Sequence, residues 1–148
     1  MSGLFVFAAC LCLPVFVAAK TLIFTYQCAR PDFLQLQCKA LKKFCQDDYE
    51  LVVFDDASNV AYSHYYKQIC HQYGARYEKV DPSIHTYAYL ERYPGEMFDH
   101  PSVRNANVVE YSLRLLGREH RDMLFLLDGD VVPAKPFSLS SWMGSHNV

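Results

Sequence analysis

The sequence contains no long run of charge of one sign. Its 14 basic and 16 acidic residues give a net charge of −2 over 148 residues. This balance offers no electrostatic attraction for nucleic acid or for an anionic membrane surface, so a function based on a basic patch is not expected. Internal repeats and low-complexity tracts are also absent, and a chain of this length can bury one core. The sequence therefore predicts a single globular domain.

Metal-binding patterns of cysteine and histidine are missing as well. The six cysteines include no Cys-x-x-Cys pair and the six histidines are not spaced as ligands, so a zinc site is not expected. Four cysteines follow residue 19, and in an exported chain they could form one or two disulfides, whose pairing the spacing does not give. Cys38 and Cys45 fall on the apolar side of a predicted helix, where cysteine is expected to be a small buried side chain.

Charged side chains are absent from the first 19 residues, MSGLFVFAACLCLPVFVAA. The apolar run ends in Val-Ala-Ala before Lys20, which is typical of a cleaved secretory signal peptide. Pro14 and the short length disfavour a spanning helix. We expect residues 1–19 to be a signal peptide and residues 20–148 to be one domain in the secretory pathway or outside the cell. The alternatives are association with a membrane through an uncleaved anchor, and a cytoplasmic chain with a misassigned start.

Strand and helix patterns alternate after residue 20. Short apolar runs predict strands at 21–26, 51–54 and 123–127, and residues 75–80 predict a further, more exposed strand. Helical spacing predicts helices from Pro31 through Cys45, from Ser58 or Asn59 to Gly74, and over 102–116. In the second helix, the residues expected to face the core are Ala61, Tyr65, Ile69 and Tyr73. This alternation predicts a Rossmann-like α/β fold, with a mostly parallel sheet and crossover helices.

A ligand site in such a fold is expected at the carboxyl ends of the strands. Two acidic clusters stand there, Asp55-Asp56 and the Asp128-Gly129-Asp130 of FLLDGDVVP. Asp-Gly between apolar runs also indicates a hairpin, but Pro133 leaves a return strand of only three residues. In extended backbone, Asp128 and Asp130 would point the same way and could bind Mg²⁺ or Mn²⁺, with Gly129 leaving space for phosphates. The preceding run is expected to be the most buried strand.

These motifs together resemble the nucleotide-binding half of GT-A glycosyltransferases of the family 2-like group. The resemblance covers about residues 21–137 and is carried by TLIFTYQCARPD, VVFDDAS, SVRNANVVEYSLRLL and FLLDGDVVP. VVFDDAS is similar to the family's Asp-Asp-Gly-Ser string, with Ala57 in place of glycine. The resemblance implies a nucleotide-diphosphate sugar as donor, favouring a UDP-sugar, and Mn²⁺ or Mg²⁺ as cofactor.

The resemblance also implies roles for individual residues. Asp55 or Asp56 would contact the uracil or ribose, and the loop from Tyr26 to Arg30 would lie against the base. Either Arg104 or Asn105 would approach the donor from the start of its helix. Asp130 would be the more direct metal ligand, and Asp128 would reach the metal through water or face the ribose.

No carboxylate follows Asp130, although the catalytic base of inverting members of this family comes after the corresponding strand. The resemblance therefore implies a partial domain that holds the donor but lacks the acceptor and catalytic half. One alternative is a haloacid-dehalogenase-like phosphatase with Asp128 as nucleophile and Asp130 as acid/base, although its motif strand normally comes early in the domain. Another is a secreted α/β interaction module without catalysis.

Overall fold

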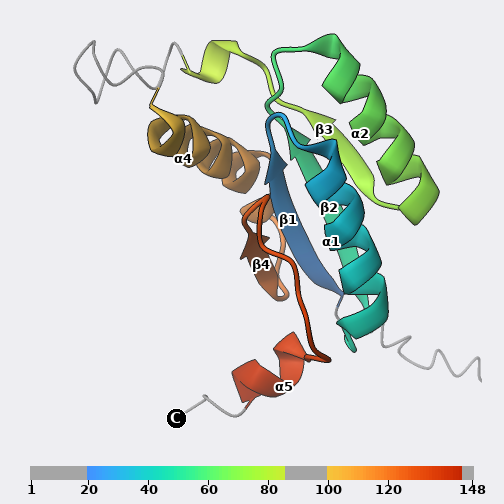
Figure 1. Cartoon of the computed structure of the whole chain (residues 1–148). Helices are drawn as coiled ribbons and strands as arrows, with labels where there is room; N and C mark the ends of the chain where they lie inside the picture. The colour runs from blue at the N-terminus through green and yellow to red at the C-terminus, as the bar shows by residue number, and fades with distance from the viewer. Residues whose placement is uncertain (1–19, 86–99, 145–148) are drawn as a thin grey trace, which may run out of the picture.

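The computed structural model describes residues 20–85 and 100–144. Its centre is a four-stranded, all-parallel sheet with helices between the strands, which is a Rossmann-like α/β fold, as the sequence predicts (Figure 1). The strands are β1 (Thr21–Gln27), β2 (Tyr49–Asp55), β3 (Arg76–Lys79) and β4 (Leu124–Leu127). The helices are α1 (Pro31–Phe44), α2 (Val60–Tyr73), α4 (Pro101–Ser112) and α5 (Leu139–Gly144), and a π-helical turn, η2 (Leu113–Gly117), follows α4. The predicted leader, residues 1–19, lies outside the described residues.

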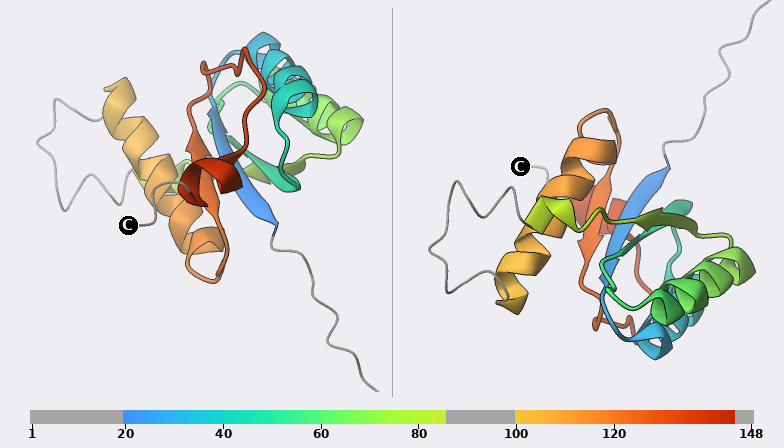
Figure 2. Two further views of the ribbon diagram at one scale, coloured as in Figure 1. Left: turned by 90° about the horizontal axis from the view of Figure 1, so that it is seen from below. Right: turned by 90° about the horizontal axis from the view of Figure 1, so that it is seen from above.

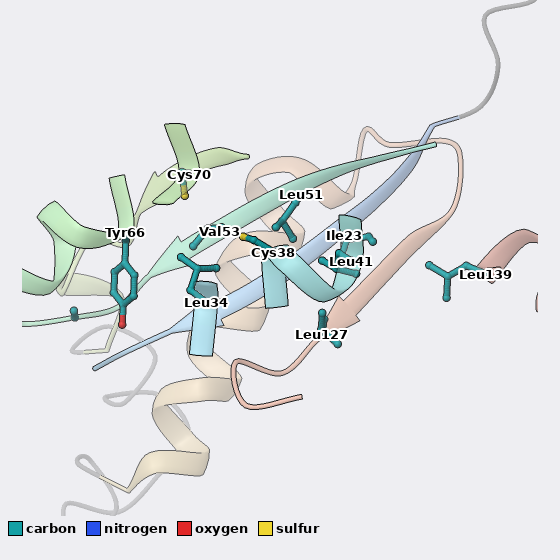
Figure 3. Close-up of a cluster of buried hydrophobic side chains, with 11 residues drawn as sticks. Ile23, Leu34, Cys38, Leu41, Leu51, Val53, Tyr66, Cys70, Leu127 and Leu139 are labelled. Atoms are coloured by element: carbon teal, nitrogen blue, oxygen red, sulfur yellow. The ribbon is translucent and has the colours of Figure 1, made fainter. Parts of the chain in front are cut away.

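The two faces of the sheet are covered by different helices, with α1 and α2 on one side and α4 on the other (Figure 2). Alternate residues of β1 enter the two cores because successive strand side chains point to opposite faces. Ile23 packs in one cluster with Leu34 and Leu41 of α1 (Figure 3). Phe24 packs in the second cluster with Val108 of α4. The sheet is thus a buried central layer, which explains its apolar strands.

The strand order, β3-β2-β1-β4, reverses direction at β1. The chain builds β1, β2 and β3 outward, and α4 then carries it across the other face to place β4 on the free side of β1. In open parallel sheets, ligands bind at the carboxyl ends of the strands where the order reverses. The carboxyl ends of β1 and β4 are therefore the expected place for a site.

Strand β4 is not the most buried strand, contrary to the expectation from its apolar sequence. Among the described strands it pairs only with β1, so one edge of β4 is free, and Leu126 is 42% exposed. The buried strand is β1, all seven residues of which are buried. The sequence marks β4 as apolar but does not determine its position at the edge of the sheet.

The buried face of α2 is centred one position away from the predicted one, although two of the predicted residues, Ile69 and Tyr73, pack against the core. Tyr66 and Cys70 are buried, whereas Tyr65 is 53% exposed. The helix ends were predicted correctly, since Asn59 caps its start through a bond from the Ala61 N–H and Gly74 ends it in the left-handed conformation. Because residues 65 and 66 are both tyrosines, the apolar pattern alone did not show which of them faces the core.

The segment after β4 returns to the amino end of the sheet and ends in α5. Phe137 forms an isolated parallel bridge with Cys45, and Leu139 joins the core between α1 and the sheet. The carboxylate of Asp47 accepts hydrogen bonds from the backbone N–H groups of Leu139 and Ser140 at the start of α5. Within residues 20–85 and 100–144, no helix is long and apolar enough to cross a bilayer.

Candidate functional site

A cavity of about 200 Å³ lies at the carboxyl edge of the sheet, between the end of β1 and the start of α4. Its lining consists of Tyr26, Gln27, Cys28, Asp56, Pro101, Arg104, Asn105 and Val108. Four of the residues expected to bind a donor, Tyr26, Asp56, Arg104 and Asn105, are thus brought together from segments up to 79 positions apart. The cavity is smaller than a typical site for a whole organic ligand, so it can enclose only part of a nucleotide sugar.

Two side chains, those of His85 and Arg104, hold the carboxylate of Asp56 in place on the cavity wall. One carboxylate oxygen is 2.7 Å from Nε2 of His85, and the other accepts a 2.9 Å hydrogen bond from the guanidinium of Arg104. His85 is buried, and its Nδ1 has no hydrogen-bond partner among the described residues. Sequence reasoning missed His85, because a lone histidine in an irregular segment gives no signal that it meets a carboxylate 29 positions away.

Asp55 has a different environment from its neighbour and does not line the cavity. Its side chain is fully buried and accepts hydrogen bonds from the Ala57 N–H at 2.8 Å and from the Tyr77 hydroxyl at 2.7 Å. Lys79 lies 3.3 Å from it as a counter-ion. Asp55 therefore joins β2 to β3 and orders the turn into α2, while Asp56 is the carboxylate available to a ligand.

Residues 128–131 form a turn, not the extended backbone expected from the sequence. Strand β4 ends at Leu127, and the Val131 N–H donates a 3.1 Å hydrogen bond to the carbonyl of Asp128. Asp128 and Asp130 therefore do not lie on a common strand face. Both aspartate side chains are exposed, and residues 131–136 form no return strand, so the motif is not a hairpin.

The turn lies directly against the end of β1. A Cβ atom added to Gly129 would come within 2.2 Å of the Tyr26 carbonyl oxygen, so glycine is required here for close packing of backbone on backbone. Burial raises the pKa of Tyr26, a hydrogen bond with Ser112 opposes this rise, and the negative charge of Asp128 adds to it. Tyr26 is therefore the physical link between the cavity that it lines and the aspartate turn.

Two buried glutamines donate hydrogen bonds to the backbone of the same turn. Gln37 of α1 donates to the carbonyls of Asp128 and Val131 at 2.6 and 2.8 Å. Gln27 of β1 donates to the carbonyl of Gly129 at 3.4 Å. Neither glutamine was found from the sequence. The sequence indicates them only weakly, because Gln27 directly follows the apolar run 21–26 and Gln37 stands on the apolar side of α1.

Arg30 is not among the residues that line the cavity. Its guanidinium pairs with Asp32 at 2.7 Å and lies over the Phe33 ring, with most of the side chain exposed. Its backbone N–H donates to the hydroxyl of Tyr66. The loop from Tyr26 to Arg30 thus contributes its first three residues to the cavity, whereas Arg30 turns back toward the start of α1.

Cys28 lines the cavity with an exposed thiol, which sequence reasoning also missed. Burial and the charge of Asp56 raise the pKa of this thiol, so it is largely protonated near neutral pH. The other three described cysteines, Cys38, Cys45 and Cys70, are free thiols too. The disulfides that an exported chain could form are therefore not present among the four described cysteines.

The residues present fit a divalent cation only together with a ligand. In the described part of the chain, no group of three or more His, Cys, Asp or Glu side chains could hold a metal ion by itself. Asp128 and Asp130 offer two carboxylates in one exposed turn. Mg²⁺ and Mn²⁺ are commonly held by one or two carboxylates plus phosphate oxygens and water. Asp128 and Asp130 are thus a suitable set for a metal that arrives with a diphosphate.

Comparison of the sequence with protein-family models and with curated proteins finds no match.

Proposed function

We propose that this chain binds a nucleotide-diphosphate sugar, with a UDP-sugar favoured, as the donor-binding part of a glycosyltransferase. The observation that carries the proposal is the arrangement at the carboxyl edge of the sheet. A cavity lined by Tyr26, Asp56 and Arg104 adjoins an exposed turn with two carboxylates, at the place where the strand order reverses.

The chemistry of the lining suits a nucleoside. Asp56 supplies acceptor oxygens, and Arg104 and Asn105 supply donors, which together can pair with the edge of a base or with ribose hydroxyls. Because His85 and Arg104 already bond to Asp56, its carboxylate is oriented before a ligand arrives. Tyr26 adds an aromatic side chain to the cavity wall.

The diphosphate would extend from the cavity over the turn of residues 128–131. Mn²⁺ or Mg²⁺ at Asp128 and Asp130 would neutralise the charge that develops on the departing nucleoside diphosphate. The chain's own contribution is to present these carboxylates at a fixed distance from Tyr26. The proposal concerns donor binding, since the described residues after Asp130 contain no carboxylate that could deprotonate an acceptor.

The proposal is tested by titrating the purified full chain with UDP in the presence and absence of Mn²⁺. We expect binding that depends on the metal and that weakens about tenfold or more in Asp130→Ala, which corresponds to the loss of one charged ligand. The matched control is Asp122→Ala, an exposed aspartate at the opposite end of β4, which should bind like the unmodified chain. Absence of binding to every nucleoside diphosphate, with and without metal, would contradict the proposal.

The phosphatase alternative predicts a different result. It requires magnesium-dependent hydrolysis of a generic phosphomonoester such as p-nitrophenyl phosphate, and loss of this activity in Asp128→Asn. The proposed donor site predicts no such turnover by the unmodified chain. Hydrolysis that Asp128→Asn abolishes would therefore replace the glycosyltransferase proposal.

A further inference from the structure

The buried side chain of Gln37 lies at the centre of a hydrogen-bond network beneath the aspartate turn. It is fully buried in α1, yet its partners come from β1 and from the segment after β4, up to 94 positions away. Its amide oxygen accepts from the Thr25 hydroxyl at 2.9 Å and from Gln27 at 3.1 Å. Its amide nitrogen donates to the carbonyls of Asp128 and Val131. All four bonding positions of this amide are thus used.

The two carbonyls that accept from Gln37 stand at the two ends of the turn. Residues 128 and 131 are also joined to each other by the bond from the Val131 N–H to the Asp128 carbonyl. A single rigid amide therefore fixes the position of both ends of the turn relative to α1 and β1. Gln27 fixes the middle of the turn by donating to the Gly129 carbonyl.

Among the described residues, few other hydrogen bonds hold this turn in place. The aspartate side chains are exposed, and β4 pairs with β1 only up to Leu127 among the described strands. Beyond Leu127, the backbone is kept close to Tyr26 by the glutamine bonds and by the close packing of Gly129. A metal site needs its ligands held within a fraction of an ångström by the residues behind them.

From this geometry we propose that Gln37, assisted by Gln27, is the positioning residue for the carboxylates of Asp128 and Asp130. Its amide aligns the turn for joint binding of a divalent cation and a diphosphate, and it contacts neither ligand itself. This inference rests on the proposed donor-binding function for its consequence, but the anchoring of the turn by Gln37 is a separate property and can be measured without any ligand.

The anchoring is tested first in the unmodified full chain by NMR. We expect the two side-chain amide protons of Gln37 to exchange slowly with water, because the side chain is fully buried and both protons are hydrogen-bonded to backbone carbonyls. The matched control in the same spectrum is Gln35, two positions away on α1 and partly exposed, whose side-chain amide should exchange rapidly. Equal exchange at Gln35 and Gln37 would overturn the inference, whether or not the chain binds nucleotide.

The consequence for ligand binding is tested with Gln37→Met, which keeps the volume but removes the amide. We expect the affinity for UDP in the presence of Mg²⁺ to fall about tenfold or more, as for a misplaced charged ligand, and the Val131 N–H to exchange faster. Gln35→Met should change neither. Cys70→Ala, which removes a buried side chain from the core side of α2, controls for lost stability and should retain the affinity while it remains folded.

A second variant keeps the inference falsifiable if Gln37→Met does not fold. Gln37→Glu retains the acceptors for Thr25 and Gln27, but an ionised carboxylate cannot donate to the two turn carbonyls. It should also lose affinity for Mg²⁺ with UDP while it remains folded. Unchanged affinity in either folded variant would overturn the positioning role. If the unmodified chain binds no nucleotide, the proposed function fails, while the exchange measurement still decides the anchoring.

Discussion

At the scale of single residues, Asp55 and Asp56 differ in what surrounds their carboxylates. Asp55 is fully buried and accepts from Ala57 and Tyr77, with Lys79 as counter-ion. Asp55→Asn should lower the free energy of unfolding by about 2–4 kcal/mol, because the amide loses the ion pair and turns an NH₂ group toward a donor. Chemical denaturation measures this loss. The control Asp48→Asn, at an exposed position, should stay within about 0.5 kcal/mol of the unmodified chain.

Gly129 and Gly144 form a matched pair for testing the packing of the turn. Gly129→Ala places a Cβ 2.2 Å from the Tyr26 carbonyl, so the backbone of the turn or of β1 must move. We expect a loss of about 1–3 kcal/mol in unfolding free energy together with weaker nucleotide binding. Gly144→Ala meets nothing within 4 Å and should be neutral or slightly stabilising. Equal effects in thermal denaturation would contradict the close approach.

Cys28 provides a chemical probe of the cavity. Its thiol is exposed on the cavity wall, whereas burial raises the pKa of Cys38 to about 11 and that of Cys70 to about 12. Because the thiolate is the reactive form, iodoacetamide should modify Cys28 first, faster as the pH rises, and more slowly in the presence of Mg²⁺ and UDP. Peptide mass spectrometry resolves the cysteines. Protection of Cys45 instead of Cys28 would place the nucleotide elsewhere.

At the scale of elements, the docking of α5 depends on the charge of Asp47. Burial raises the pKa of Asp47, but the hydrogen bonds from Ser140 and from the Leu139 N–H outweigh burial and hold the pKa below its usual value. A lowered pKa means that the contribution to stability is complete above the unfolded pKa, about 4, and is lost as the pH falls through the folded pKa. The contact is expected to contribute about 1–3 kcal/mol.

The only tryptophan, Trp142, lies in α5 and reports this docking. Its fluorescence should change as the pH falls below about 4, before the sheet unfolds by circular dichroism. Asp47→Asn should show the undocked fluorescence at neutral pH and no further acid transition at Trp142. A tryptophan signal that follows global unfolding in both proteins would show that Asp47 does not control α5.

Much of the element order could be predicted from the sequence, because local rules set it. Asn59 and Gly74 mark the ends of α2 by capping chemistry, and apolar runs mark β1, β2 and β4. The buried side of α2 and the exposure of β4 could not be predicted. Both depend on which neighbours a segment meets in the fold, and those contacts are not encoded in its own periodicity.

In the candidate site too, residues placed by local rules could be predicted, and residues that act through distant partners could not. Tyr26, Asp56, Arg104 and Asn105 follow predicted strand ends or start a predicted helix, so their meeting at the cavity could be expected. His85 and Gln37 could not be found, since each acts through a partner far away in the sequence. The shape of the aspartate turn was also beyond local reasoning, because it is set by the glutamines beneath it.

At the scale of the whole molecule, the proposed function assigns the nucleotide to one edge of the sheet. The opposite, amino edge also carries a cavity, lined in part by Lys20, Arg76 and His120, so the two edges can be compared in one experiment. The charge on the amino edge is mixed, and the aspartate turn lies at the other end of β4. The proposed function therefore requires a response at only one of the two edges.

The most direct measurement is the map of backbone amide shifts when UDP and Mg²⁺ are added to the full chain. Binding at the carboxyl edge predicts shifts at Cys28, Asn105 and Gly129, which belong to that edge, and none at His120 on the amino edge. Shifts confined to the amino edge, or none at a saturating concentration of UDP, would contradict it.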